Sequence, residues 1–443
     1  MFSKILVANR GEVAVRILRA CREMGVHTVC VHSEPDREAL HVMLGDESYC
    51  IGPAKVSDSY LNMNAIIQVA LMTGCEAIHP GYGLLSENAE FSKLCADNGI
   101  VFIGPDSETI GKMGDKETAR KIMKASGVPV VPGFEGLSDA AEALAKSEEV
   151  GFPLLLKATA GGGGKGIRLV EKREELSDMW NLAEREARSS FLNGTLYMEK
   201  YLTDVKHVEV QVLCDMHGKV ITLGERDCSV QRRNQKIIEE TPCPILTEEE
   251  RQAVALYAKN AVQSIGYVGL GTIEFLFSNE RNFYFMEMNT RLQVEHPVTE
   301  MVSGVDLVQW QIRVHAGIPL PDKLFGIKNI GHSIECRIIA ENPDEDFRPS
   351  AGKIAFLHIP GGPGVRFDTA LYQGAVLSPF YDSMVGKLIV HAQNRDLAIR
   401  KMKSALGELI VDGIDTNIDF NMKILNSDKF KDGTFTTSDL KGV

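Results

Sequence analysis

The sequence lacks the features that would place it in a membrane, outside the cell or on a nucleic acid. Its 443 residues contain no apolar run of 18 residues, and no signal-peptide-like segment follows the N-terminus, so neither membrane insertion nor secretion is expected. Acidic residues outnumber basic residues by 60 to 48, which gives a net charge of −12 without a prominent basic run. We therefore do not expect general binding to nucleic acid.

Cysteine chemistry is also sparse. The nine cysteines are an odd number, and no two of them are close enough to form a CxxC zinc or redox pair. This pattern predicts a reduced, cytoplasmic protein with buried thiols. The apolar content of 44% and the charged content of 24% are those of an ordinary globular protein, and the length allows about three domains.

Two common nucleotide-binding motifs are missing as well. The first predicted strand, residues 4–8, leads into a helix over about residues 12–24 without a GxGxxG turn. Residues 161–166 match GxGxxG by letter only, because an apolar strand and not a helix follows them. Gly166 follows Lys165 where a Walker A loop needs Ser or Thr. The sequence therefore predicts neither a Rossmann nor a P-loop nucleotide site.

The glycine stretch predicts a different kind of phosphate site. It lies between two apolar segments, residues 153–157 and 167–170, so it reads as the tip of a hairpin. Four consecutive glycines are costly to order, which makes an ordinary turn a poor explanation. We expect a lid whose backbone amides close over the phosphates of a nucleotide, and an ordinary turn is the alternative.

Strands and helices alternate from the N-terminus to about residue 105, which predicts a doubly wound α/β domain with a parallel sheet. His79-Pro80-Gly81-Tyr82-Gly83 ends one of these strands, where open α/β sheets tend to bind ligands. A rigid Pro-Gly turn is the alternative reading of this segment. A loop-like stretch, residues 319–330, marks a later boundary, and a third unit of short strands and an amphipathic helix over about 396–409 follows it.

A second hairpin carries paired acids. Residues 272–277 and 283–289 read as two strands joined by the polar turn 278–282. If Phe277 pairs with Tyr284, Glu274 lies directly opposite Glu287, and like charges in that position destabilise a hairpin. A bound Mg²⁺ would reverse this, because it is commonly held by one or two carboxylates and substrate phosphates. The alternative is a solvated hairpin edge with unpaired acids.

Polar residues continue this pattern on neighbouring segments. Polar residues recur at two-residue intervals after Glu287, namely Asn289, Arg291, Gln293 and Glu295. Arg291 offers a cation for an oxyanion, and Glu295 offers a carboxylate that can act as a base. Residues 207–212 alternate strictly, so His207 shares one strand face with two other polar residues. Residues 226–236 form the one locally basic segment, and taken alone this segment would more often be a solvated loop than a site.

Taken together, these stretches resemble biotin carboxylase, the ATP-grasp subunit of acetyl-CoA carboxylases, over essentially the whole chain. The resemblance rests on KILVANRGEVAVRI, HPGYGLLSEN, MGDK, KATAGGGGKGI, RDCSVQRRNQK, EMNTRLQVEHPVTE and the arginine at position 337. It implies an ATP-grasp architecture: an N-terminal doubly wound α/β domain (1–112), an ATP-grasp domain (113–322) with its lid at about 130–203, and a C-terminal mixed α/β domain (331–443).

The resemblance also implies site residues. The ATP-binding residues would be Lys116 and Lys157 at the phosphates, the lid residues Gly161, Gly162, Gly163 and Gly164, the adenosine contacts Glu199, Lys200 and His207, and Gln231 and Asn234 near the ribose. The metal ligands, for two Mg²⁺ or Mn²⁺ ions, would be Glu274, Glu287 and Asn289. Ala160 and Asn234 depart from the residues that some members carry, glycine and histidine, so the ribose contact of Asn234 is in doubt.

The remaining implied residues carry the carboxylation. Bicarbonate would be held by Lys236, Arg291, Gln293 and Val294, and biotin by Tyr82, Gly83 and Arg337. The catalytic residues would be Lys236, Arg291, Glu295 as the base and Arg337 as the partner of the biotin enolate. The implied reaction is ATP-dependent carboxylation of biotin through carboxyphosphate, the first half-reaction of acetyl-CoA carboxylase in fatty acid synthesis.

The chain carries no Met-Lys-Met biotin acceptor and no carboxyltransferase region, so a separate biotin carboxyl carrier protein and separate transferase subunits are expected. The family also implies a homodimer. Three other functions stay open at this point. They are an ATP-grasp ligase of the carbamoyl-phosphate synthetase type, the carboxylase subunit of a different acyl-CoA carboxylase, and a regulatory protein that binds ATP without turnover.

Overall fold

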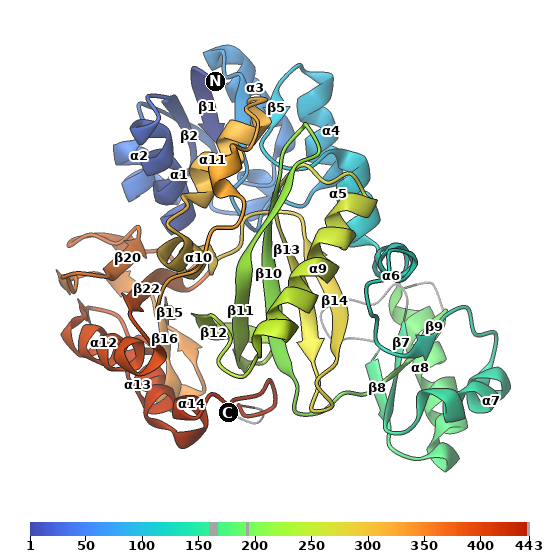
Figure 1. The fold of residues 1–443 in the computed structure, drawn as a ribbon. Helices are drawn as coiled ribbons and strands as arrows, with labels where there is room; N and C mark the ends of the chain where they lie inside the picture. Colours follow the sequence, from blue (N-terminus) through green and yellow to red (C-terminus); the bar gives the residue numbers. More distant parts are fainter. Residues whose placement is uncertain (159–166, 192–194, 441–443) are drawn as a thin grey trace.

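The N-terminal part of the chain forms a five-stranded parallel sheet in the order β3-β2-β1-β4-β5, drawn in blue and cyan in Figure 1. The computed structural model describes residues 1–158, 167–191 and 195–440. The predicted doubly wound parallel domain is confirmed. Its strands are β1 (Lys4–Val7), β2 (His27–Ser33), β3 (Glu47–Gly52), β4 (Ala77–His79) and β5 (Val101–Phe102), and its helices are α1 (Gly11–Glu23), α2 (Leu40–Leu44), α3 (Met63–Thr73), α4 (Ala89–Asp97) and α5 (Ser107–Gly114).

A small antiparallel sheet with two helices projects to the right in Figure 1. Its strand order is β6-β9-β7-β8. Asp115 caps the helix that leads to it, because its carboxylate accepts a hydrogen bond from the Thr118 amide. The glycine stretch 161–166 lies outside the described residues. The elements here are α6 (Lys116–Ala125), β6 (Gly133–Phe134), α7 (Ala140–Val150), β7 (Leu154–Ala158), β8 (Ile167–Val170), α8 (Leu176–Phe191) and β9 (Leu196–Lys200).

An eight-stranded antiparallel sheet joins the central part of the chain to its C-terminal part. Its order is β14-β13-β10-β11-β12-β15-β22-β20, and β12 pairs directly with β15 across the segment in which a boundary is predicted. The strands are β10 (Lys206–Cys214), β11 (Val220–Arg232), β12 (Gln235–Thr241), β13 (Gly269–Phe277), β14 (Phe283–Asn289), β15 (His332–Ile339), β20 (Val365–Thr369) and β22 (Met384–Ala392).

Helices cover both faces of this sheet. On one face, α9 packs against apolar side chains of β10 and β13, and α12 packs against those of β15 and β22. On the other face, α10 contacts β11, β12, β15 and β22. The remaining elements are α9 (Glu248–Ser264), α10 (His296–Ser303), α11 (Leu307–His315), α12 (Arg395–Glu408), α13 (Ile418–Asn426), α14 (Asp428–Lys431), and the short strands β16 (Glu341–Asn342), β17 (Arg348–Pro349), β18 (Gly352–Lys353), β19 (Phe356–His358), β21 (Val376–Leu377) and β23 (Ile410–Asp412).

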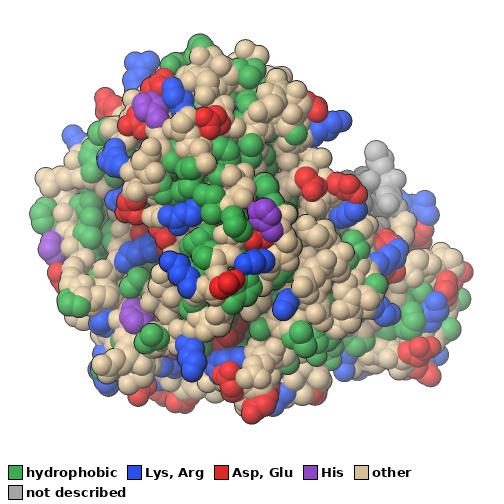
Figure 2. All heavy atoms as spheres, turned by 45° about the horizontal axis from the view of Figure 1, so that its top comes forward, with side chains coloured by type: hydrophobic (Ala, Val, Ile, Leu, Met, Phe, Trp, Pro, Cys, Tyr) green, Lys and Arg blue, Asp and Glu red, His purple; other side chains and the backbone are tan. Residues whose placement is uncertain are grey.

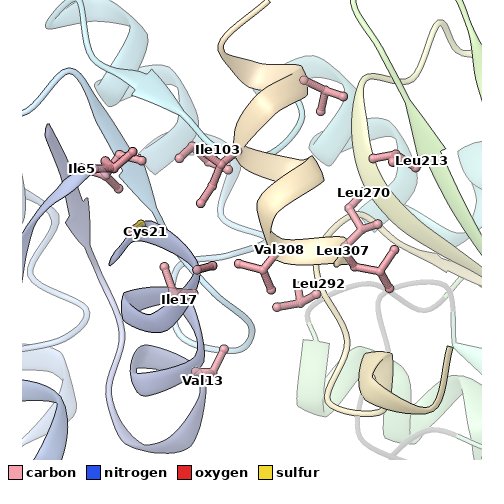
Figure 3. Close-up of a cluster of buried hydrophobic side chains, with 14 of the residues drawn as sticks. Ile5, Val13, Ile17, Cys21, Ile103, Leu213, Leu270, Leu292, Leu307 and Val308 are labelled. Atoms are coloured by element: carbon pink, nitrogen blue, oxygen red, sulfur yellow. The ribbon is translucent and has the colours of Figure 1, made fainter. Parts of the chain in front are cut away.

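A shared apolar cluster fixes the N-terminal domain on the eight-stranded sheet. Figure 3 shows Val13 and Ile17 of α1 beside Leu292, Leu307 and Val308, with side chains from the central strands completing the cluster. Burial of such side chains contributes about 1.5–3 kcal/mol each, so this contact holds the loop before α10 in a fixed position. That loop carries several of the predicted site residues.

The surface of the molecule is mixed in charge. On the face in Figure 2, Lys and Arg side chains alternate with Asp and Glu side chains over the whole view. Within the described ranges, no helix combines the length and the apolar character that a membrane span requires.

The paired acids of the second hairpin lie opposite each other, as predicted, but the strand register that places them there differs from the predicted register. Phe277 pairs with Phe283 and not with Tyr284, and a β-bulge at Met286 then brings Glu287 opposite Glu274. The bulge has a physical reason, because Phe283 and Phe285 must face the apolar core while Glu287 must face the other side. The extra residue changes the alternation between these two parts of the strand.

This register makes a testable prediction about two single-residue deletions. Removing the bulge residue Met286 leaves Phe283, Phe285 and Met288 on one face, so we expect a folded protein. Removing Tyr284 turns an aromatic residue out of the core and should cost about 3 kcal/mol or more. Thermal unfolding followed by circular dichroism compares the two variants. An equally large loss of stability in both variants would contradict the bulge assignment.

Candidate active site

One face of the eight-stranded sheet is lined with buried charged side chains. Successive side chains of a strand point to opposite faces of the sheet, which separates these charged side chains from the apolar core. In β10 the valines face α9, while His207 and Glu209 face the other side. Neighbouring strands add the buried residues Arg226, Glu239, Glu274, Glu335 and Lys387 and the partly buried residues Lys236 and Arg337. Buried charges of this kind must be paired or serve a ligand, so this face is the candidate site.

Lys236 is the centre of the site. Its ammonium group lies 2.6 Å from Glu209 Oε2, 2.9 Å from Glu274 Oε1 and 2.6 Å from Glu295 Oε1. Burial alone would lower the pKa of Lys236, but the three carboxylates raise it well above its ordinary value. The lysine is therefore charged, and it is held by three acids at once.

Buried Arg226 positions the first of these acids. Its guanidinium donates to Glu209 Oε1, to Gln211 Oε1 at 2.7 Å and to the hydroxyl of Thr299 at 3.0 Å. Taken alone, residues 226–236 would more often be a solvated loop, and the structure shows that this isolated reading does not hold. They form the end of β11, a turn and the start of β12, and only the turn residues and Gln235 are exposed.

Glu274 accepts hydrogen bonds on one carboxylate oxygen and has an imidazole beside the other. Oε1 accepts from Lys236, from Asn289 Nδ2 at 2.9 Å and from Gln293 Nε2 at 2.9 Å, and Oε2 lies 3.0 Å from His207 Nε2. Gln231 donates to His207 Nδ1 at 2.8 Å, so in a neutral imidazole the proton is on Nε2, facing Glu274. Burial opposes ionisation of Glu274, but Lys236 and His207 outweigh it and lower its pKa well below the ordinary value.

Glu287 lies opposite Glu274 and makes no hydrogen bond or ion pair with the described residues. Its burial raises its pKa, and the negative charge of Glu274 raises it further. Two facing carboxylates and the amide oxygen of Asn289 are a set of hard oxygen donors, which suits Mg²⁺ or Mn²⁺. The residues present therefore fit a divalent cation, which would stabilise the charge of Glu287 beside that of Glu274.

Arg337 lies on the other side of Glu295. It donates to Glu239 Oε1 at 2.6 Å and to Glu295 Oε2 at 3.0 Å. Burial raises the pKa of Glu239 to about 7. Burial also acts on Glu295, but Lys236 and Arg337 outweigh it and hold the pKa of Glu295 far below its usual range. Glu295 thus bridges the two cations, one through each oxygen.

Arg291 occupies the wall of the same site. It donates to Glu87 Oε2 at 2.7 Å and to Asn289 Oδ1 at 2.7 Å. Its neighbour Gln293 bonds to Glu274, and the carbonyl of Val294 accepts from Lys387 at 2.8 Å. The short loop between β14 and α10 therefore brings the predicted bicarbonate residues together with Lys236.

The predicted nucleotide residues fall into two groups. His207, Gln231 and Asn234 line a cavity of about 460 Å³ together with the metal and bicarbonate residues. Lys157 and Glu199 form an ion pair on the small sheet, and Lys200 ends the same strand as Glu199. Lys116 begins α6 and is exposed. Gly161 to Gly164 lie outside the described residues. Of the second group, the described residues Lys116, Lys157, Glu199 and Lys200 do not line that cavity.

A second cavity, of about 550 Å³, contains the predicted biotin residues Tyr82 and Gly83. The two cavities share five lining residues, namely Gln235, Lys236, Arg291, Val294 and Arg337. One compartment therefore opens toward paired carboxylates that fit a cation, and the other toward an aromatic side chain. Cations line the wall between them.

Sequence reasoning missed several residues of this site. Glu87, Glu239, Lys387 and Glu12 pair with predicted site residues, but each lies far along the chain from its partner. Glu209 was missed as well, although the sequence gives a local indication of it. It shares the polar face of a strictly alternating strand with His207. The other partners follow from the strand register, which the sequence does not reveal.

The full sequence matches three family models. They are "Biotin carboxylase, N-terminal domain" over residues 1–110, "Carbamoyl-phosphate synthase L chain, ATP binding domain" over 115–323, and "Biotin carboxylase C-terminal domain" over 335–442. Biotin carboxylase 1 of Bacillus subtilis is 51% identical over 443 residues, which is 100% of this chain and 98% of the relative. The chloroplastic biotin carboxylase of Arabidopsis thaliana is 51% identical over 98% of this chain and 81% of its own.

Solved structures agree with these matches. A biotin carboxylase complex with β,γ-ATP from Campylobacter jejuni has a TM-score of 0.93 at 48% identity, covering 99% of this chain and 98% of that chain. The biotin carboxylase domain dimer of 2-oxoglutarate carboxylase from Hydrogenobacter thermophilus, with MgADP, ADP and bicarbonate, has a TM-score of 0.91 at 48% identity, covering 99% and 97%. The predicted ATP-grasp architecture is confirmed.

The charge balance around Lys236 makes a prediction about pH. In the native protein the pKa values of Glu274 and Glu295 are lowered, so their ionised forms stabilise the fold above the ordinary carboxyl range. In Lys236→Met the burial of both acids remains without the ammonium, so their pKa values should rise. The loss of stability should therefore grow as the pH rises from 5 to 8, toward the roughly 3–5 kcal/mol expected for a broken buried pair.

Thermal unfolding at several pH values tests this prediction. Lys116→Met is the matched control, because Lys116 is an exposed lysine that forms no ion pair with the described residues. Its midpoint should follow that of the native protein at every pH. A deficit in Lys236→Met that stays constant or shrinks with rising pH would contradict the assigned charges.

Proposed function

The chain belongs to the biotin carboxylase family, and on that premise we propose that it carboxylates biotin with bicarbonate at the expense of ATP. The observation that carries this proposal is the cationic wall between the two cavities, formed by Lys236, Arg291 and Arg337. An enzyme with two successive half-reactions needs one anion-binding position that both substrates can reach. The rival named for carbamoyl-phosphate synthesis explains the central domain, but it is not favoured, because both flanking domains match biotin carboxylase.

Bicarbonate activation is assigned to the wall residues. Bicarbonate lies against Lys236, Arg291, Gln293 and Val294, and Glu295 removes its proton. In the free protein Glu295 is a weak base, because two cations hold its charge. An incoming anion competes for the same cations, which weakens their hold on Glu295 and raises its proton affinity. The base is thus activated by the substrate that it deprotonates.

The phosphoryl transfer needs position and charge more than covalent chemistry. The bicarbonate oxygen attacks the γ-phosphorus of ATP, the bond to the β-phosphate oxygen breaks, and carboxyphosphate and ADP form. The phosphates are bound by Lys116, Lys157 and Gly161 to Gly164. The nucleoside is bound by Glu199, Lys200, His207, Gln231 and Asn234. Glu274, Glu287 and Asn289 would hold two Mg²⁺ or Mn²⁺ ions, which neutralise phosphate charge.

The carboxylation itself is assigned to the second cavity. Carboxyphosphate breaks down to CO₂ and phosphate, and the phosphate takes the proton from N1 of biotin. Arg337 faces the biotin oxygen that becomes negative, and Tyr82 and Gly83 hold the ureido ring. The N1 electron pair then attacks CO₂ and gives carboxybiotin. Arg337 suits both steps, because Glu295 bridges it to Lys236.

The proposal extends to partners and place. Biotin is presented on a biotin carboxyl carrier protein, and carboxyltransferase subunits pass the carboxyl group to acetyl-CoA for fatty acid synthesis. The enzyme is a cytoplasmic homodimer in this proposal. It is supported by the dimer of the Hydrogenobacter thermophilus domain and by nine free cysteines, of which only Cys50 is exposed.

Phosphate release from ATP tests the function most simply. We expect release to require bicarbonate and to rise when free biotin is added. Bicarbonate-independent ATP hydrolysis would favour a different ATP-grasp ligase, and ATP binding without any turnover would favour a regulatory protein.

Mutation should separate the two half-reactions. Arg337→Ser should abolish carboxybiotin formation but keep part of the bicarbonate-dependent phosphate release, because carboxyphosphate still forms and decays in water. Lys236→Gln should lose both by about 10²-fold or more, since the phosphoryl transfer loses a charge partner. Phosphate and carboxybiotin are measured in the same reaction. Equal losses of both products in Arg337→Ser would assign this arginine to phosphate chemistry instead.

A further inference from the structure

Lys387 is a fully buried lysine outside the residues assigned above. It lies on β22, directly opposite Arg337 in the strand register, and none of its surface is exposed. Its ammonium donates to the carbonyl of Val294 at 2.8 Å and lies 3.2 Å from Glu12 Oε1. A buried charge is costly, so a lysine placed here needs a purpose beyond stability.

Glu12 connects this lysine to the second cavity. Glu12 is on α1 of the N-terminal domain, and its Oε1 accepts a hydrogen bond from the hydroxyl of Tyr82. The ammonium of Lys387 also lies 6.0 Å from the centre of the Tyr82 ring. Burial raises the pKa of Glu12, and Lys387 acts in the opposite direction. One chain of contacts therefore runs from Val294 through Lys387 and Glu12 to Tyr82.

The three segments in this chain come from three parts of the protein. Val294 belongs to the loop before α10, Lys387 belongs to strand β22 of the eight-stranded sheet, and Glu12 belongs to helix α1. We propose that Lys387 and Glu12 are positioning residues that set the bicarbonate loop and the biotin-facing Tyr82 in register with each other. The inference rests on the proposed function and deepens it.

Glu12 and Lys387 differ in the segments that they contact. Glu12 contacts Tyr82 but not the bicarbonate loop, whereas Lys387 contacts Val294 and, through Glu12, Tyr82 as well. Loss of Glu12 alone should therefore disturb the biotin side, and loss of Lys387 should disturb both sides. A purely structural role for the pair predicts no such separation.

Two variants with different folding risks test this. Glu12→Gln keeps the size of the side chain, and Asp368, a buried acid directly opposite Lys387 in the strand register, remains to balance the ammonium. The paired variant Glu12→Gln/Lys387→Met removes both charges together, which avoids an unpaired buried ion. The matched control is Glu240→Gln/Arg395→Met, which removes a largely buried ion pair of 2.7 Å between β12 of the same sheet and helix α12.

The readout is steady-state phosphate release and carboxybiotin formation with ATP, bicarbonate and free biotin, with thermal unfolding as the check on folding. Glu12→Gln should raise the KM for biotin about tenfold, the range for a hydrogen bond to a charged group, and change the KM for bicarbonate less than twofold. The paired variant should raise both KM values. The control should change neither by more than twofold.

A double-mutant cycle adds a readout that a structural role would not produce. If Tyr82 acts through Glu12, the combination Tyr82→Phe/Glu12→Gln should be no worse for the biotin KM than the more damaging single change. Additive losses would overturn the Tyr82 link, as would a biotin KM in Glu12→Gln within twofold of the native protein. An unchanged bicarbonate KM in the paired variant would overturn the Val294 link.

The native protein separates this inference from the proposed function. If biotin does not stimulate phosphate release in the native protein, the proposed function fails and the inference fails with it. If the native protein responds to biotin and the variants behave like the control, only the positioning role is lost.

Discussion

The site depends on one ion cluster, in which the ammonium of Lys236 is held by Glu209, Glu274 and Glu295. A lysine that binds anionic substrates needs acidic neighbours in a buried site, because burial alone would lower its pKa and favour its neutral form. The surrounding acids keep it charged, and an entering anion can displace their contacts. The same arrangement recurs where Lys157 pairs with Glu199 and where Arg291 pairs with Glu87.

The fold explains how such a cluster can form. A single antiparallel sheet carries the paired carboxylates at one end and Arg337 and Lys387 nearer the other, and alternation puts all of these side chains on one face. The loop before α10 then lies across this face with Val294 and Glu295. Because β12 pairs with β15, Lys236 and Arg337, which serve the two proposed half-reactions, are held by continuous backbone hydrogen bonds rather than by a flexible joint between domains.

The sequence was informative where its signal was local. The alternating strand at His207 and the placement of Glu274 opposite Glu287 were predicted from spacing, and the structure contains both. The closing pair of that hairpin was predicted wrongly, because a bulge cannot be foreseen without knowing which face of the strand is buried. Taken alone, residues 226–236 favour a solvated loop because their charges are local, while the acids that neutralise them are distant in sequence. Only the family resemblance indicated Gln231, Asn234 and Lys236 as site residues. Partners such as Glu239 and Glu12 depend on strand register and domain packing, so no local pattern indicates them.

The central claim is that bicarbonate, and not water, attacks ATP at the wall of Lys236, Arg291 and Glu295. Oxygen-18 in bicarbonate tests it directly, because attack on the γ-phosphorus leaves one bicarbonate oxygen attached to phosphorus. Mass spectrometry of the released phosphate, in the presence of biotin and unlabelled water, should find one labelled oxygen for each carboxybiotin formed. Phosphate without the label, released at the same rate, would show that water attacks ATP and would contradict this account.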